Sequence, residues 1–318
     1  MKSLFRICIL CLLAVGLSAA EPAYSPLDLM VAGRVDDAVK VLNSRVQSSP
    51  QDAEAYHLLS RAYFHLHKWD QAISNGEKAV QLAPAKSDYY LWLGRAYGEK
   101  ASDSNFVTAA GLTKKIRSSF EKAVELDGTN VAARTDLSEF YVEAPGFMGG
   151  GLDKAAEQAK QIAAHDPARA HWVSAKIAEK RKDYGTAERE YYAAINQAQD
   201  ADYWLNLGSF YRKRERWNDL DTAVAKAMDA PHKKPNALYD AATLLFEAQR
   251  NLPMAADLLR KYLSAVPNEE APAFQAHHLL AQVLEKMGDK RGAAAEYRAS
   301  LSLASNYSPS QDGLKRVS

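Results

Sequence analysis

Residues 53–84 read AEAYHLLSRAYFHLHKWDQAISNGEKAVQLAP, and the spacing of residue types in this stretch returns along most of the chain. The first half places four residues at i, i+3, i+4 and i+7, the spacing of one face of an α-helix. These residues are Tyr56, Leu59, Ser60 and Tyr63. The first half of the stretch therefore predicts an amphipathic helix.

The second half follows a break at residues 67–70 and predicts a second helix. Ala72, Gly76 and Ala79 recur at i, i+4 and i+7, so this helix has a face of small residues that can lie close against its partner. Pro84 then prevents the helix from continuing. The two halves together predict a helical hairpin.

The hairpin pattern repeats along the chain. One hairpin length further on, the spacing of Tyr56, Leu59, Ser60 and Tyr63 returns as Tyr90, Leu93, Gly94 and Tyr97, and a return of this kind indicates a helical repeat. The pattern resembles the tetratricopeptide repeat (TPR), which has a bulky residue, Leu-Gly and Tyr, then Ala, a large residue and a closing Pro. Parts of this signature return at Ala187, Tyr191 and Ala194, at Trp204, Leu207, Gly208 and Tyr211, at Tyr239, Phe246, Ala255, Leu259 and Pro267, and at Leu280, Ala281, Ala293 and Tyr297.

The resemblance implies an all-α fold, a right-handed superhelical solenoid of stacked antiparallel helix hairpins. Each hairpin exposes apolar faces on both sides, so the units bury a continuous core only by stacking. We therefore expect residues 21–318 to form one solenoid of about eight units with a truncated first unit. The expected units are 24–50, 53–84, 87–128, 131–167, 168–199, 200–231, 236–267 and 274–305, followed by a C-terminal tail.

Residues 1–20 have the features of a secretory signal peptide. Lys2 and Arg6 precede an apolar run over residues 7–17, and small residues at 18–20 suit a cleavage site. The alternative is an uncleaved membrane anchor, but a spanning helix needs about 20 apolar residues. We expect an exported protein, periplasmic or secreted, that is soluble after cleavage and has no stable membrane span.

Cysteine usage and charge limit the chemistry of the remaining chain. Both cysteines, Cys8 and Cys11, lie in the apolar run, so residues 21–318 contain no disulfide. The chain has 40 basic and 39 acidic residues, and no basic excess that would favour a nucleic-acid partner.

Two insertions interrupt the repeat phase. Around residues 98–116 the second helix of its unit arrives late, which predicts a helix lengthened at its start, from near Ser104, or alternatively a flexible loop. Residues 144–151 contain three consecutive glycines and predict an irregular loop between two helices. Such a loop can carry a function or serve only as a connection.

In TPR proteins the first helix of each hairpin lines a concave groove that binds partner segments, and the resemblance carries this expectation over. In this chain the groove should be lined by the stripe of residues that point away from the signature face of each first helix. This stripe contains His57 and Arg61 in one unit and Arg95 in the next, with Trp92 beside Arg95. The two arginines are one repeat period apart and should project side by side, where they could hold a carboxylate by bidentate hydrogen bonds. We predict that this part of the groove binds an acidic or C-terminal segment of a protein partner.

Two alternatives remain open at this point. The arginines of the stripe could simply pair with neighbouring Asp or Glu side chains of the same chain. The protein could also be a solute- or glycan-binding module that uses groove aromatics such as Trp92 and Trp172.

The sequence gives little support to catalysis. His65 and His67, and likewise His277 and His278, have the spacing of metal ligands, but no fixed third or fourth ligand accompanies either pair. Motifs for a nucleophile elbow, a phosphate loop or a dinucleotide site are absent from the sequence. We expect a non-enzymatic scaffold without metal or cofactor.

Overall fold

The computed structural model describes residues 24–233, 236–265 and 268–318, and the predicted signal peptide lies outside this part of the chain. The described residues form helices and no strand. The α-helices are α1 (Pro26–Val31), α2 (Val35–Ser48), α3 (Ala53–His65), α4 (Trp69–Leu82), α5 (Ser87–Ser102), α6 (Phe106–Leu126), α7 (Val131–Glu143), α8 (Leu152–Ala163), α9 (Pro167–Lys180), α10 (Tyr184–Ala198), α11 (Ala201–Arg212), α12 (Trp217–Asp229), α13 (Ala237–Glu247), α14 (Leu252–Ser264), α15 (Ala273–Lys286), α16 (Lys290–Leu303) and α17 (Ser308–Val317). The predicted all-α solenoid is confirmed.

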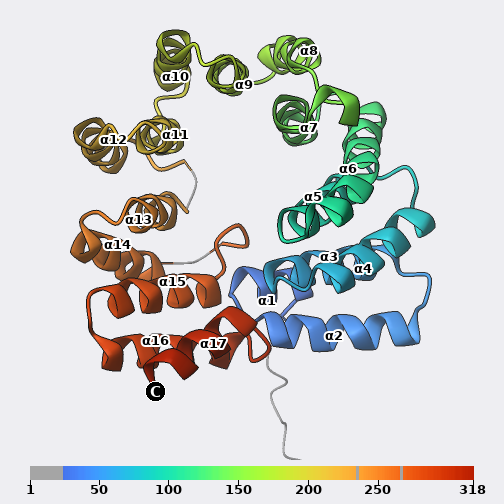
Figure 1. Ribbon diagram of the computed structural model, residues 1–318. Coiled ribbons are helices and arrows are strands. Elements are labelled where there is room, and N and C mark those ends of the chain that lie inside the picture. Colours follow the sequence, from blue (N-terminus) through green and yellow to red (C-terminus); the bar gives the residue numbers. More distant parts are fainter. Residues whose placement is uncertain (1–23, 234–235, 266–267) are drawn as a thin grey trace, which may run out of the picture.

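Consecutive helices pair as antiparallel hairpins, and each hairpin packs on the next. Figure 1 shows the first helix of each hairpin, such as α7, α11 and α13, on the inner side of a ring, and the second helix, such as α8, α12 and α14, on the outer side. The stripe predicted to contact a partner belongs to first helices, so the fold places it on the inner side.

Small residues let the helices of a hairpin approach closely. Ala72 and Ala79 of α4 are fully buried. A Cβ atom at Gly94 of α5 would lie 2.5 Å from the Phe120 ring of α6, which is closer than a real Cβ contact. At Gly94 a side chain would therefore collide with the Phe120 ring, and only a shift of that ring or of the two helices would make room for it.

The truncated first unit begins with a short helix, α1. The Ser25 hydroxyl accepts a hydrogen bond from the Asp28 amide, and the Asp28 carboxylate accepts one from the Ser25 amide, which forms a capping box. Pro26 at the first helical position fits the fixed φ of proline. This capping offsets the marginal stability of a six-residue helix.

Both insertions have defined structures. The first lengthens α6, which has 21 residues against 14 in α4 and begins at Phe106, just after the predicted start, with the Asn105 side chain as its cap. The second contains a 3₁₀ turn, η1 (Gly146–Met148), which contacts α6. The exposed apolar residues Phe106, Val107 and Phe147 belong to these insertions.

The stack closes on itself, which the sequence pattern does not predict. Figure 1 shows α15 and α17 beside α1 and α2, so that the hairpins form a ring. We call this contact between the first and last hairpins the seam. Its apolar part is a cluster separate from the main core, made of Leu29, Met30, Val35, Ala38, Ala62, Leu66, Phe274, Ala304 and Tyr307.

The seam also contains a close backbone approach and polar contacts. Gly33, at φ +73°, is so near to Ala273 that a Cβ atom at Gly33 would lie 2.8 Å from the Ala273 Cβ. The Ser305 amide donates a hydrogen bond of 2.7 Å to the Asp36 carboxylate. The ends of the solenoid are therefore held together by specific contacts and not by proximity alone.

Within the described residues, no helix is both long and apolar enough to cross a membrane.

Candidate functional site

The predicted partner-binding residues lie together on α3 and α5. The guanidinium carbon of Arg61 lies 4.9 Å from the Trp92 ring centroid, and that of Arg95 lies 5.0 Å from it. Both distances are within the range of cation–π attraction. The repeat period therefore does bring Arg61, Trp92 and Arg95 into one cluster, which we call the arginine–tryptophan cluster.

Each arginine of this cluster also contacts a carboxylate of the same chain. Arg95 Nε donates a hydrogen bond of 2.6 Å to Asp136 Oδ2 on α7. Arg61 makes a two-point contact with Glu269, which lies in the segment between α14 and α15, and its Nε–Oε1 distance is 2.9 Å. Intramolecular pairing is the alternative that the sequence left open, and binding of a partner by these arginines stays a prediction.

His57 is placed differently from the arginines. Its side chain is buried, with 4% of its surface exposed, and its ring is stacked on Tyr89 with a centroid distance of 4.3 Å. Its Nε2 atom lies 3.2 Å from Asp88 Oδ2, and the hydrogen bond from His57 lowers the pKa of the Asp88 carboxyl. His57 thus fixes the α3–α5 contact and offers little surface to a partner.

Glu269 has an electrostatic environment that keeps it ionised. Burial acts to raise the pKa of Glu269, but His65 and the Arg61 guanidinium lower it more, so the pKa lies below its usual value. His65 Nε2 is 3.5 Å from Glu269 Oε1. The two α3 residues therefore form a slot that accepts a carboxylate, and Glu269 fills it.

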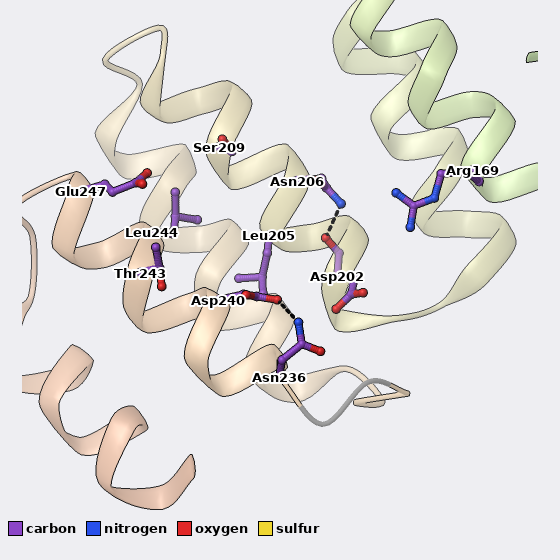
Figure 2. Close-up of a pocket in the computed structure, with 10 residues that line it drawn as sticks. All are labelled: Arg169, Asp202, Leu205, Asn206, Ser209, Asn236, Asp240, Thr243, Leu244 and Glu247. Atoms are coloured by element: carbon purple, nitrogen blue, oxygen red, sulfur yellow. Dashed lines mark hydrogen bonds between the residues drawn. The ribbon is translucent and has the colours of Figure 1, made fainter. Parts of the chain in front are cut away.

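A second hollow lies on the inner side of the ring at α9, α11 and α13. It is a cavity of about 320 Å³, and Figure 2 shows ten side chains around it. These are Arg169, Asp202, Leu205, Asn206, Ser209, Asn236, Asp240, Thr243, Leu244 and Glu247. The lining is mostly polar, with Leu205 and Leu244 as its apolar members, which differs from the mostly apolar lining of small-molecule pockets.

Hydrogen bonds within the chain orient much of this lining. Asn236 Nδ2 donates to Asp240 Oδ2 at 2.7 Å, and Asn206 Nδ2 donates to the Asp202 carbonyl at 2.8 Å (Figure 2). Asn236 is 7% exposed, and its Oδ1 atom has no hydrogen-bond partner among the described residues. One acceptor at the edge of this cavity is therefore unsatisfied.

Trp172, the second aromatic residue of the ligand-binding alternative, is nearly buried. Only 8% of its surface is exposed, and the Arg169 guanidinium lies 5.2 Å from its ring centroid. A sugar or flat solute would have to displace Arg169 to stack on this face.

Two features of the inner side, the Glu269 contact and the cavity at α9–α13, are absent from the expectations drawn from the sequence. Glu269 escapes the repeat pattern because its partner Arg61 is 208 positions away in the chain. The cavity at α9–α13 is also missing from them, because its lining residues Arg169, Asn206 and Thr243 do not occupy equivalent positions in their helices. The repeat period therefore gives no signal for this cavity.

Within residues 24–233, 236–265 and 268–318, no group of three His, Cys, Asp or Glu side chains is arranged to hold a metal ion. His277 contacts Glu296 at 2.6 Å, and His278 contacts the Ser310 hydroxyl at 2.9 Å. Both histidines are thus engaged in contacts within the C-terminal hairpins.

Models of the tetratricopeptide repeat match two units of this chain, residues 53–86 and 274–307. The matches fall on α3–α4 and on α15–α16, two hairpins on either side of the seam. This chain contains tetratricopeptide repeats. TPR solenoids are in general scaffolds for protein–protein interaction, and the fold of this chain suggests the same broad role.

Solved structures share the TPR fold. Yeast Tom70 matches with a TM-score of 0.55 and 14% identity over 94% of this chain, which spans 65% of the Tom70 structure. A thermophilic TPR protein of Thermus thermophilus is 24% identical over 58% of this chain and 96% of its own, with a TM-score of 0.48. At these identities the likeness shows the fold alone. No curated protein matches the TPR chain in sequence.

Proposed function

We propose that this TPR protein is an exported, non-enzymatic scaffold that binds a segment of a partner protein on the inner side of its ring. The arginine–tryptophan cluster is the proposed contact, and an acidic or C-terminal segment is the proposed ligand. The observation that carries this proposal is the placement of two guanidinium groups within 5.0 Å of one indole ring on first helices.

The cluster has the chemistry that a carboxylate-bearing segment requires. A guanidinium presents several donors in one plane and binds carboxylates by paired hydrogen bonds, as Arg61 does with Glu269. Trp92 is half-buried and supplies an apolar wall next to the charge. The Arg95 side chain is 31% exposed, so one guanidinium remains accessible while it pairs with Asp136.

Export is proposed from residues 1–20, which have the organisation of a signal peptide and lie outside the described residues. The compartment would be the periplasm or the extracellular space. A comparison of the chain length in whole cells and in the exported fraction tests this directly, because cleavage after Ala20 would remove the whole of this segment.

The partner proposal is tested by crosslinking capture from a native extract. Arg61→Gln combined with Arg95→Gln removes both guanidinium groups, and we expect it to abolish capture of the partner that the wild type retains. Glu269→Gln is the matched control, because it weakens the same Arg61 contact but leaves both arginines in place.

Two results would contradict the proposal. Capture that survives the double arginine variant would exclude the arginine–tryptophan cluster as the contact. Equal loss of capture in Glu269→Gln would show that the partner depends on the closed seam and not on the guanidinium groups.

A further inference from the structure

The segment 268–275, with the sequence NEEAPAFQ, makes several of the contacts that close the seam. Glu269 occupies the slot formed by Arg61 and His65. Phe274 is 1% exposed and belongs to the apolar cluster of the seam. Gln275 Nε2 donates a hydrogen bond of 2.9 Å to the His65 carbonyl on α3.

Hydrogen bonds within the segment and to α14 hold it in a fixed turn against α3. Asn268 Oδ1 accepts a hydrogen bond from the Ala271 amide at 2.9 Å, which forms a compact turn. The Tyr262 hydroxyl holds the base of the turn by donating to the Ala271 carbonyl at 2.6 Å and accepting from the Asn268 amide at 3.1 Å. The turn is thus fixed from the α14 side and would keep its shape if the seam opened.

The surface under the segment has three features of a peptide-binding site. It has a slot for a carboxylate lined by the Arg61 guanidinium and the His65 ring, a backbone acceptor at the His65 carbonyl, and an apolar patch formed by Leu29, Met30 and Leu66. Gly33 lets the bound backbone approach closely. These features accept a segment with a carboxylate and an aromatic side chain five positions later.

We propose that residues 268–275 are an internal ligand of the slot formed by Arg61 and His65, where Arg61 is part of the arginine–tryptophan cluster, and that the partner segment displaces them. The partner segment would carry an acidic residue followed, five positions later, by an aromatic residue. This inference rests on the proposed function and adds the chemistry of the partner and the reason that its site is closed in the free protein.

An internal ligand competes strongly because it is tethered. Segments held on one chain reach effective concentrations of about millimolar, and tethering changes apparent affinity by factors of about 10²–10⁴. A free peptide with the same contacts therefore binds the closed ring weakly. Removal of the Glu269 carboxylate and the Phe274 ring should therefore let the free peptide bind at the slot and the apolar patch.

The test uses the peptide acetyl-NEEAPAFQ-amide with a fluorescent label, and its binding to the full chain is measured by fluorescence anisotropy. The receptor is either the wild type or the variant Glu269→Gln with Phe274→Ala, which keeps the slot and the apolar patch but removes what fills them. We expect this variant to bind the peptide at least about tenfold more tightly than the wild type does.

Two controls test the chemistry. A peptide with Gln for its first Glu and Ala for its Phe should bind the variant at least about tenfold more weakly than the original peptide. Adding Arg61→Gln to the variant should have the same effect. The circular dichroism spectrum of each variant must match that of the wild type, and Glu269→Gln alone serves as a milder receptor if the double variant does not fold.

Absence of peptide binding to folded Glu269→Gln, or equal binding of the original and control peptides, would overturn the inference. Equal affinity of wild type and variant would overturn it as well, because an internal ligand must compete. The proposed function would survive these results if partner capture still required Arg61 and Arg95, so the two failures are distinguishable.

Discussion

The contacts between neighbouring hairpins differ from the contacts across the seam. At the α11–α13 contact, a Cβ atom at Gly208 would lie 2.8 Å from a Leu244 methyl group, and Leu207 and Leu245 are 0% and 1% exposed. At the seam, a smaller apolar cluster is supplemented by the Arg61–Glu269 ion pair. The ring is thus held by continuous apolar packing along most of its length and by a partly ionic contact at one place.

This difference indicates that the seam can open without unfolding the hairpins. Stability in a stacked repeat protein is approximately a sum over units and neighbour contacts. A destabilising substitution within the stack therefore lowers the stability of its whole unit. A destabilising substitution at the seam lowers the free energy of unfolding by no more than the free energy of ring closure.

The largest effect is expected from a matched pair of phenylalanines, each 1% exposed. Phe210→Ala in α11 should lower the free energy of unfolding by about 3–5 kcal/mol, the usual cost of such a cavity. Phe274→Ala at the seam should lower it less, because opening of the seam relieves the cavity. Urea unfolding followed by circular dichroism compares the two, and an equal loss of stability would contradict the distinction.

A smaller effect is expected from overpacking a hairpin. Ala72 is fully buried in α4, and the Ser60 hydroxyl donates a hydrogen bond of 2.7 Å to its carbonyl. Ala72→Leu should cost about 1–3 kcal/mol, because the helices α3 and α4 cannot separate without disturbing the stack. An unchanged melting temperature would show that α4 has room at this position.

Glu269→Gln should destabilise the seam by about 1 kcal/mol and leave the rest of the stack unchanged. The amide keeps one hydrogen-bond acceptor for Arg61 but removes the charge that strengthens the contact. Hydrogen exchange should accelerate in α1–α3 and α15–α17, while exchange in α9–α12 stays at the wild-type rate. Acceleration throughout the ring would mean that the seam and the stack open together.

The smallest effect is a pH dependence of the seam. The pKa of Glu269 is lowered in the folded protein, so the unfolded or open state binds more protons as pH falls. The contribution of Glu269 is therefore present at neutral pH and is lost as the pH falls through its folded pKa. Hydrogen exchange in α1–α3, measured relative to α9–α12 as the pH is lowered, should show this loss in the wild type and much less of it in Glu269→Gln.

The fold could be predicted from the sequence to the extent that it depends on local patterns. The spacing of Tyr90, Leu93, Gly94 and Tyr97 specifies a hairpin helix whatever the rest of the chain does. The longer α6 also follows from a local pattern, since the inserted residues keep a helical period. Closure of the ring depends on the sum of the small rotations between successive hairpins. No local sequence pattern determines that sum.

The candidate site shows the same limit. The cluster of Arg61, Trp92 and Arg95 follows from the repeat period because neighbouring repeats place equivalent residues side by side. Glu269 joins Arg61 only because the ring closes, so its role could not be found from the period. The burial of His57 depends on the Tyr89 ring stacked on it, which the stripe pattern does not include.

Closure also fixes how many hairpins this molecule can contain. An open solenoid tolerates the gain or loss of a repeat, because each end needs only a polar cap. Here the last hairpins cover the apolar face of the first, with Phe274 and Tyr307 packed in one cluster with Leu29 and Met30. One hairpin more or fewer would misalign these faces and expose both. The repeat number is therefore constrained as strictly as the blade number of a propeller, and length variation should be confined to insertions such as those that extend α6 and form η1.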